Sequence, residues 1–232
     1  MKEKLLLLHG ALGSKQDLAA IKVLLSKQYD CYDMNFEGHG GRSTNRPFSI
    51  ASFSENVVEF LSQHSLDQVS VFGYSMGGYV ALYMAIHHPA RIRQVLTLGT
   101  KFDWNLDSAR QEVKMLNPDL ILEKVPQFAQ KLEQTHQPND WKEVMQMTAD
   151  MMIHMGEGAR LEASDLAKIA IPVSIGIGSK DRMVSFEESE WAAKHISQSQ
   201  LITLEGVRHE IDRVDINILE SYIDTNLKPH RS

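Results

Sequence analysis

The stretch VFGYSMGGYVALYMA, from Val71 to Ala85, decides the fold. It begins with apolar residues that favour β-strands, passes through Gly73 to Gly78, and continues as a helix-forming sequence. A G-x-S-x-G pattern between a predicted strand and a predicted helix is typical of a sharp turn that holds a serine hydroxyl above the end of the strand. Glycines before and after the serine are expected where a side chain would collide with neighbouring backbone. The pattern therefore predicts that Ser75 is a nucleophile.

A serine hydroxyl is a weak nucleophile at neutral pH and needs a base, which in turn needs an orienting acid. Of the ten histidines, His209 is best placed, because it follows the last predicted strand in EGVRH. Asp181 ends the segment GIGSKD, at the carboxyl end of the preceding strand. Asp103, in GTKFDW after the fourth strand, is the alternative acid. We expect Ser75, Asp181 and His209 to meet at one edge of the sheet.

An ester-cleaving serine also needs two N–H donors for the oxyanion. The N–H of Met76, directly after the nucleophile, is the first expected donor. The loop HGALGS after the first strand supplies the second, for which we predict Ala11, with Leu12 as the alternative.

Short apolar strands alternate with amphipathic helices along most of the chain. Strands are predicted at 4–10, 29–41, 68–75, 92–100, 171–181 and 199–206, and helices at 17–26, 49–64, 76–88, 187–195 and 211–227. This alternation predicts an α/β fold, with a mostly parallel sheet of about six strands covered by helices on both faces.

Residues 102–165 interrupt the alternation, because they contain no convincing strand and prolines divide them into short helices. We expect an α/β core of residues 1–101 and 166–232, with 102–165 inserted after the fourth strand as a helical lid. Six of the eleven methionines lie in this insertion, and Met147, Met151 and Met155 share one helical face. That stripe either packs the lid onto the core or lines an adaptable apolar pocket. The residues predicted to line a substrate pocket are Tyr74, Trp104, Met151 and Met155.

Five segments in order, LLLLHGALGS, NFEGHGGRS, VFGYSMGGYVAL, GIGSKDRMV and EGVRHE, resemble the α/β-hydrolase family, in its compact serine hydrolase branch. The resemblance implies a Ser/Asp/His triad, no cofactor and a lid after the fourth strand. Asn35 stands where members often carry Asp. Tyr79 stands where the members acting in menaquinone synthesis tend to carry Arg. Ser75 argues against the haloalkane dehalogenases and epoxide hydrolases of this fold, which use Asp as nucleophile.

Composition excludes several other classes of protein. The net charge is −6 and there is no long basic run, which argues against nucleic acid as a partner. Cys31 is the one cysteine, so no internal disulfide can form, and a reducing, cytoplasmic location is expected. The apolar run Leu5 to Leu8 is too short for a signal peptide, and no stretch approaches the roughly 18 apolar residues of a membrane span. No histidine pair has metal-ligand spacing, so no metal is expected.

The sequence thus predicts a serine hydrolase that acts, through an acyl-enzyme, on a small and largely apolar carboxylic ester or thioester. Two alternatives share these features. One is a hydrolase or lyase of carbon–carbon bonds that uses the same triad, and the other is a non-enzymatic receptor for a small molecule.

Overall fold

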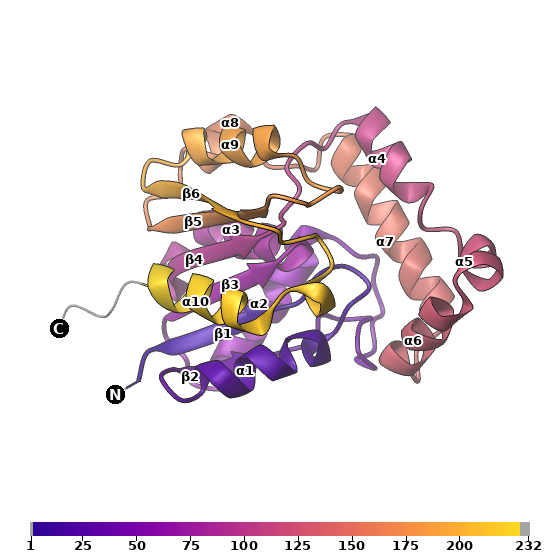
Figure 1. Ribbon diagram of the computed structural model, residues 1–232, viewed down its shortest axis with the longest axis horizontal. Coiled ribbons are helices and arrows are strands. Elements are labelled where there is room, and N and C mark those ends of the chain that lie inside the picture. The colour runs from indigo at the N-terminus through magenta and orange to yellow at the C-terminus, as the bar shows by residue number, and fades with distance from the viewer. Residues whose placement is uncertain (1, 228–232) are drawn as a thin grey trace.

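A six-stranded parallel sheet forms the centre of the computed structural model, which describes residues 2–227. The strands are β1 (Lys4–Leu8), β2 (Asp30–Asp33), β3 (Val69–Tyr74), β4 (Ile92–Leu98), β5 (Val173–Gly178) and β6 (Ser199–Leu204). Their spatial order is β2-β1-β3-β4-β5-β6, and every neighbouring pair is parallel (Figure 1). All six carboxyl ends therefore meet at one edge, as predicted for the catalytic residues.

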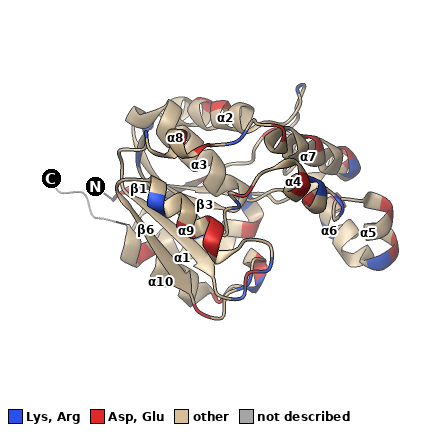
Figure 2. Ribbon diagram, turned by 90° about the horizontal axis from the view of Figure 1, so that it is seen from above, with Lys and Arg blue, Asp and Glu red and all other residues tan. Residues whose placement is uncertain are grey.

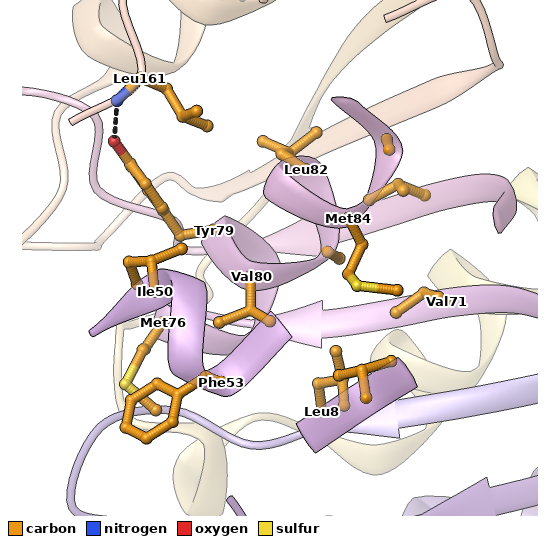
Figure 3. Close-up of a cluster of buried hydrophobic side chains, with 14 of the residues drawn as sticks. Leu8, Ile50, Phe53, Val71, Met76, Tyr79, Val80, Leu82, Met84 and Leu161 are labelled. Atoms are coloured by element: carbon orange, nitrogen blue, oxygen red, sulfur yellow. Dashed lines mark hydrogen bonds between the residues drawn. The ribbon is translucent and has the colours of Figure 1, made fainter. Parts of the chain in front are cut away.

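Helices cover both faces of the sheet, which confirms the predicted fold class. On one face lie α1 (Ala19–Leu25) and α10 (Ile216–Asn226), and on the other α2 (Ile50–Gln63), α3 (Met76–His87), α8 (Ala163–Leu166) and α9 (Phe186–His195). Side chains alternate along the buried strand β1, so Leu5 and Leu7 join one core cluster while Leu6 and Leu8 join the other. Figure 3 shows Val80 and Met84 of α3 near Val71 and Leu8.

Three predicted elements are shorter than the sequence suggested. The strand expected over 29–41 ends at Asp33, and turns follow in which Gly38, Gly40 and Gly41 have positive φ angles. The helix expected at 17–26 is a 3₁₀ turn (Lys15–Leu18) followed by α1. The helix expected at 211–227 is likewise a 3₁₀ turn (Ile211–Arg213) followed by α10, which Asp215 caps. In each case local capping or turn chemistry overrides the broader apolar pattern.

The insertion (102–165) contains α4 (Leu106–Val113), α5 (Pro118–Lys124), α6 (Pro126–His136) and α7 (Trp141–Gly156), and α8 begins at its end. Pro118 and Pro126 occupy the first positions of their helices, where a missing N–H costs nothing. The helices α4 to α7 stand against one end of the sheet (Figures 1 and 2), whereas α8 packs on α3 and α9 of the core.

The insertion has a small core of its own and carries both signs of charge. Its core consists of Ile121, Ala129, Leu132, Trp141 and Met145. Figure 2 shows basic and acidic residues on the helices α5 to α7, which therefore present no uniformly basic face. Within residues 2–227, no helix combines the length and the apolar character needed to cross a membrane.

Candidate active site

Ser75 occupies the sharp turn between β3 and α3. Its φ of 51° and ψ of −117° are strained for a residue with a side chain. A Cβ on Gly73 would lie 2.4 Å from the backbone nitrogen of Gly78, and a Cβ on Gly77 would lie 2.4 Å from the carbonyl oxygen of Leu8. The glycines are therefore needed because backbone occupies the space of a side chain.

Two hydrogen bonds from the end of β4 hold the backbone of the serine. The N–H of Ser75 donates to the carbonyl oxygen of Leu98 at 2.8 Å. The hydroxyl of Thr100 donates to the carbonyl oxygen of Ser75 at 3.0 Å. Both backbone groups of Ser75 are thus hydrogen-bonded, and the strained turn is held in place before any substrate binds.

Asp181 and His209 form a buried pair at the same edge of the sheet. Asp181 follows β5, His209 follows β6, and Nδ1 of the imidazole lies 2.8 Å from Oδ2 of the carboxylate. The side chains are only 1% and 9% exposed. Oδ1 of Asp181 accepts from the N–H groups of Met183 and Val184, at 2.8 and 2.9 Å. Because the ionised carboxylate of Asp181 accepts a hydrogen bond from Nδ1–H, the proton of the neutral ring sits on Nδ1. Nε2 of His209 is then the basic nitrogen.

The carboxylate of Asp181 is kept ionised by its partners. Burial by itself would raise the pKa of Asp181, but the hydrogen bonds from His209, Met183 and Val184 outweigh burial and hold the pKa below its ordinary value. An ionised Asp181 can stabilise the imidazolium that forms when His209 takes a proton.

Asp103 lies elsewhere. Its carboxylate is exposed and accepts from the amide of Asn105 at 3.0 Å. It lines a separate cavity of about 460 Å³, together with Glu188 and Trp191. The structure thus brings Asp181, and not the alternative acid, to His209.

Gly99 and Tyr74 shape the space around the pair. Gly99 has a φ of 63°, and a Cβ there would lie 3.2 Å from Nδ1 of His209 and 3.3 Å from Oδ2 of Asp181. Nothing in the local sequence around Gly99 indicates this role. Tyr74 was predicted to line the pocket, but its phenol donates to the carbonyl oxygen of His209 at 2.9 Å and its ring lies 5.5 Å from the imidazole. The position before the nucleophile therefore faces the base and not the pocket.

The loop after β1 is a tight turn that contains Ala11. The N–H of Gly13 donates to the carbonyl oxygen of Gly10 at 3.2 Å, and Leu12 between them has a φ of 57°. His9 is fully buried beneath the turn, where its Nδ1 lies 2.8 Å from the carbonyl oxygen of Gly10. Burial lowers the pKa of His9 to about 4, so its ring is neutral at neutral pH. Ala11 and Met76, the two predicted oxyanion donors, both line the pocket at Ser75.

That pocket is small and mostly apolar, with a volume of about 40 Å³. Three predicted residues line it, namely Trp104, Met151 and Met155. Four others that the sequence analysis did not assign complete its wall: Ile50, Tyr79, Lys101 and Met152. Of these four, only Met152 could have been predicted from the sequence, because it lies next to the methionine stripe of α7. Met151 and Met155 also belong to the main core cluster, so the stripe both packs the insertion and faces the pocket.

Tyr79 and Lys101 join the pocket wall to other parts of the molecule. The N–H of Leu161 donates to the phenol oxygen of Tyr79 at 2.6 Å, which ties α3 to the segment after α7 (Figure 3). Nζ of Lys101 lies 3.4 Å from Glu112 of α4 and 3.8 Å from Glu188 of α9. The ammonium group of Lys101 therefore pairs with carboxylates, while its side chain lines the pocket.

Within the described residues 2–227, no group of three or more His, Cys, Asp or Glu side chains could hold a metal ion. A strained serine, a histidine hydrogen-bonded to a buried carboxylate and an apolar pocket at one sheet edge are the groups that nucleophilic catalysis by a serine requires.

Three curated relatives are similar to this chain. A probable alcohol acetyltransferase of Wickerhamomyces anomalus is 31% identical over 42% of this chain, although the match spans only 29% of that protein. The 3-oxoadipate enol-lactonase 2 of Acinetobacter baylyi is 29% identical over 76% of this chain and 70% of its own length. A pimeloyl-[acyl-carrier protein] methyl ester esterase of Neisseria meningitidis is 24% identical over 89% of this chain and 86% of its own length.

A solved structure and a family model agree on the fold. The structure of NosK from Streptomyces actuosus superposes with a TM-score of 0.81 and 20% identity, covering 98% of this chain and all of that one. The model of the family described as serine aminopeptidase, S33, matches residues 1–213. The chain therefore belongs to this S33 family of α/β hydrolases.

Proposed function

We propose that this α/β hydrolase cleaves small carboxylic esters or thioesters with a short apolar acyl group, through an acyl-enzyme on Ser75. The observation that carries the proposal is the buried Asp181–His209 hydrogen bond of 2.8 Å at the sheet edge where the strained Ser75 lines an apolar pocket. A strained serine, a positioned base and a buried acid are the three parts that acyl transfer needs.

In the proposed reaction, Oγ of Ser75 attacks the carbonyl carbon of the ester while Nε2 of His209 takes its proton. The backbone N–H groups of Met76 and Ala11 bind the oxyanion of the tetrahedral intermediate. His209 then protonates the leaving alcohol or thiol, and the acyl group stays on the serine. Water then attacks the acyl carbonyl carbon while His209 takes one of its protons. The bond between Oγ of Ser75 and the acyl carbon breaks, the acid leaves, and His209 returns the proton to Oγ, with Asp181 holding the required tautomer of the imidazole.

The size of the pocket supports a short acyl group. The pocket offers about 40 Å³ to the centres of water molecules, which is room for only a small group. The walls of Trp104, Met151 and Met155 favour an apolar group there. A longer chain requires the methionines to change rotamer, which their unbranched side chains allow. The names of the lactonase and the methyl ester esterase denote ester chemistry, which agrees with the proposal.

Turnover of p-nitrophenyl acetate by the wild type and by Ser75→Ala tests the proposal. We expect multiple turnovers in the wild type and a kcat at least about 10³-fold lower in the variant, the scale for loss of a triad member. A fluorophosphonate should label the wild type at Ser75 and leave the variant unlabelled. Binding without turnover would indicate a receptor, and labelling at another serine would contradict the assignment of the nucleophile.

A further inference from the structure

His136 is the last residue of α6, and its side chain is fully buried although it belongs to the insertion. Its Nδ1 lies 3.2 Å from the backbone nitrogen of Gly40, and its Nε2 lies 3.1 Å from the carbonyl oxygen of Leu12. A backbone N–H can only donate, so Nδ1 must be the acceptor. The ring proton therefore sits on Nε2 and is donated to Leu12. The imidazole, which belongs to a helix of the insertion, is thus hydrogen-bonded to two loops of the core.

The contact falls on a strained residue beside a predicted oxyanion donor. Leu12 follows Ala11 and has a φ of 57°, a conformation that costs a leucine about 1–2 kcal/mol. Such strain persists only where surrounding contacts hold it. The side chain of Leu12 packs against the insertion's own core cluster, and its carbonyl oxygen accepts from His136. The insertion thus contacts both the side chain and the carbonyl of this residue.

The loop around Gly40 is held in other ways as well. The amide of Asn139 donates to the carbonyl oxygens of Gly38 and Arg42, both at 2.9 Å, and the amide of Asn35 donates to the carbonyl oxygen of Gly40 at 2.9 Å. Loss of the His136 bond to Gly40 therefore leaves that loop supported. Loss of the bond to Leu12 removes a support from the turn between Gly10 and Gly13.

We propose that His136 is a positioning residue for the oxyanion hole, because its Nε2–H bond to Leu12 holds the turn that presents the N–H of Ala11 to the pocket. The inference rests on the proposed function of Ser75. It makes the insertion part of the catalytic machinery as well as a cover for the pocket, since a donor from α6 fixes a group that acts on the transition state.

Two conservative variants separate the two hydrogen bonds of His136. Glutamine places an amide N–H near the position of Nε2 and keeps the donor to Leu12. Asparagine places an amide oxygen near the position of Nδ1 and keeps the acceptor for Gly40. The two amides are alike in polarity and both leave some space unfilled, so they form a matched pair. A merely structural histidine would lose stability in both variants without separating them in kcat.

We expect His136→Gln to keep kcat within about threefold of the wild type. His136→Asn should lower kcat about tenfold with little change in KM. That loss is smaller than the roughly 10²–10³-fold loss in kcat that follows removal of a whole oxyanion donor. The affinity for a trifluoromethyl ketone with a short acyl chain should fall by the same factor in the Asn variant, because its adduct carries the oxyanion. His154→Asn, at an exposed position of α7, is the control and should match the wild type.

Fluorophosphonate titration counts the competent sites in each preparation, so that kcat is expressed per labelled serine. If the wild type is labelled at Ser75 and turns over ester, but the Asn and Gln variants have equal kcat, the positioning role is refuted while the proposed function stands. A folded Gln variant with a tenfold lower kcat would refute it too, even if the Asn variant fails to fold. If the wild type neither labels nor turns over, the proposed function and the inference fail together.

Discussion

Replacement of Gly99 by alanine tests whether the backbone behind the Asp181–His209 pair sets its geometry. Gly99 has a φ of 63°, which costs an alanine about 1–2 kcal/mol. For a chain of this size, that amounts to a fall of about 2–8 °C in Tm. The new methyl group would also lie 3.2 Å from Nδ1 of His209 and 3.3 Å from Oδ2 of Asp181, so one of them must move by a few tenths of an ångström.

If the pair is displaced, Asp181 orients the imidazole less well, and we expect kcat to fall about 10- to 100-fold. This loss is smaller than the roughly 10⁴-fold loss in kcat when the acid cannot act at all. Gly206→Ala is the matched control. Gly206 has a φ of 74°, and a Cβ there meets no heavy atom within 4 Å. It should lose a similar amount of Tm and keep its kcat. Thermal melts and ester turnover on both variants give the answer. A Gly99→Ala enzyme with wild-type kcat, or equal losses in both variants, would refute the reasoning.

Three further predictions concern the acid Asp181, the pocket at Ser75 and the separate cavity that Glu188 lines. Asp181→Asn should lower kcat by about 10³–10⁴-fold because the imidazole loses its tautomer partner, whereas Asp103→Asn should stay within about twofold; the opposite ranking in an ester assay would move the acid to Asp103. Met151→Ala or Met155→Ala should shift the optimum of a C2 to C10 acyl series to longer chains, since each buried methylene is worth about 0.8 kcal/mol, or roughly fourfold in kcat/KM. An unchanged profile in variants with a lower Tm would mean that the stripe only packs the insertion. Burial raises the pKa of Glu188 from 4.5 to about 7, against the charge of Lys101, so its contribution to stability is complete below pH 4.5 and lost as pH rises through 7. Between pH 4.5 and 8, the free energy of unfolding of the wild type should therefore fall, relative to that of Glu188→Gln, by about 1 kcal/mol after allowance for solvent screening, or about 2–4 °C in Tm. A difference in Tm between the two proteins that does not change with pH would contradict this.

Much of the fold and the central residues of the candidate site could be predicted from sequence because their signals are local. The strand, glycine turn and helix around Ser75 lie within one continuous stretch, and parallel strands place Asp181 and His209 at the same edge. The face on which Tyr74 lies also follows from the strand, because Tyr74 is two residues after Phe72 on β3 and both side chains pack on the face of α1 and α10. What the alternation does not give is the hydrogen bond from its phenol to the carbonyl oxygen of His209, 135 positions away.

Contacts between distant segments were equally hidden. The ion pairs of Lys101 with Glu112 of α4 and Glu188 of α9 join three segments, and no local pattern around Lys101 indicates them. The bond between His136 and Leu12 joins residues 124 positions apart, and nothing in either local sequence indicates the other. Tertiary packing decides such pairs, so the helices of the insertion were predictable but their points of contact were not.

The path of the insertion has a consequence for how this protein can diversify. The chain leaves the sheet after β4 and returns beside α3, where Leu161 meets Tyr79, before the single turn of α8 packs on α3 and α9. The intervening segment adds no strand to the sheet. Its length and sequence can therefore change from one descendant to another without altering the register of any strand pair, while the contacts at Tyr79 and Leu12 limit that freedom. A chimera that takes this segment from a relative, with those two contacts kept, should therefore keep the six-stranded sheet and change only what covers its edge.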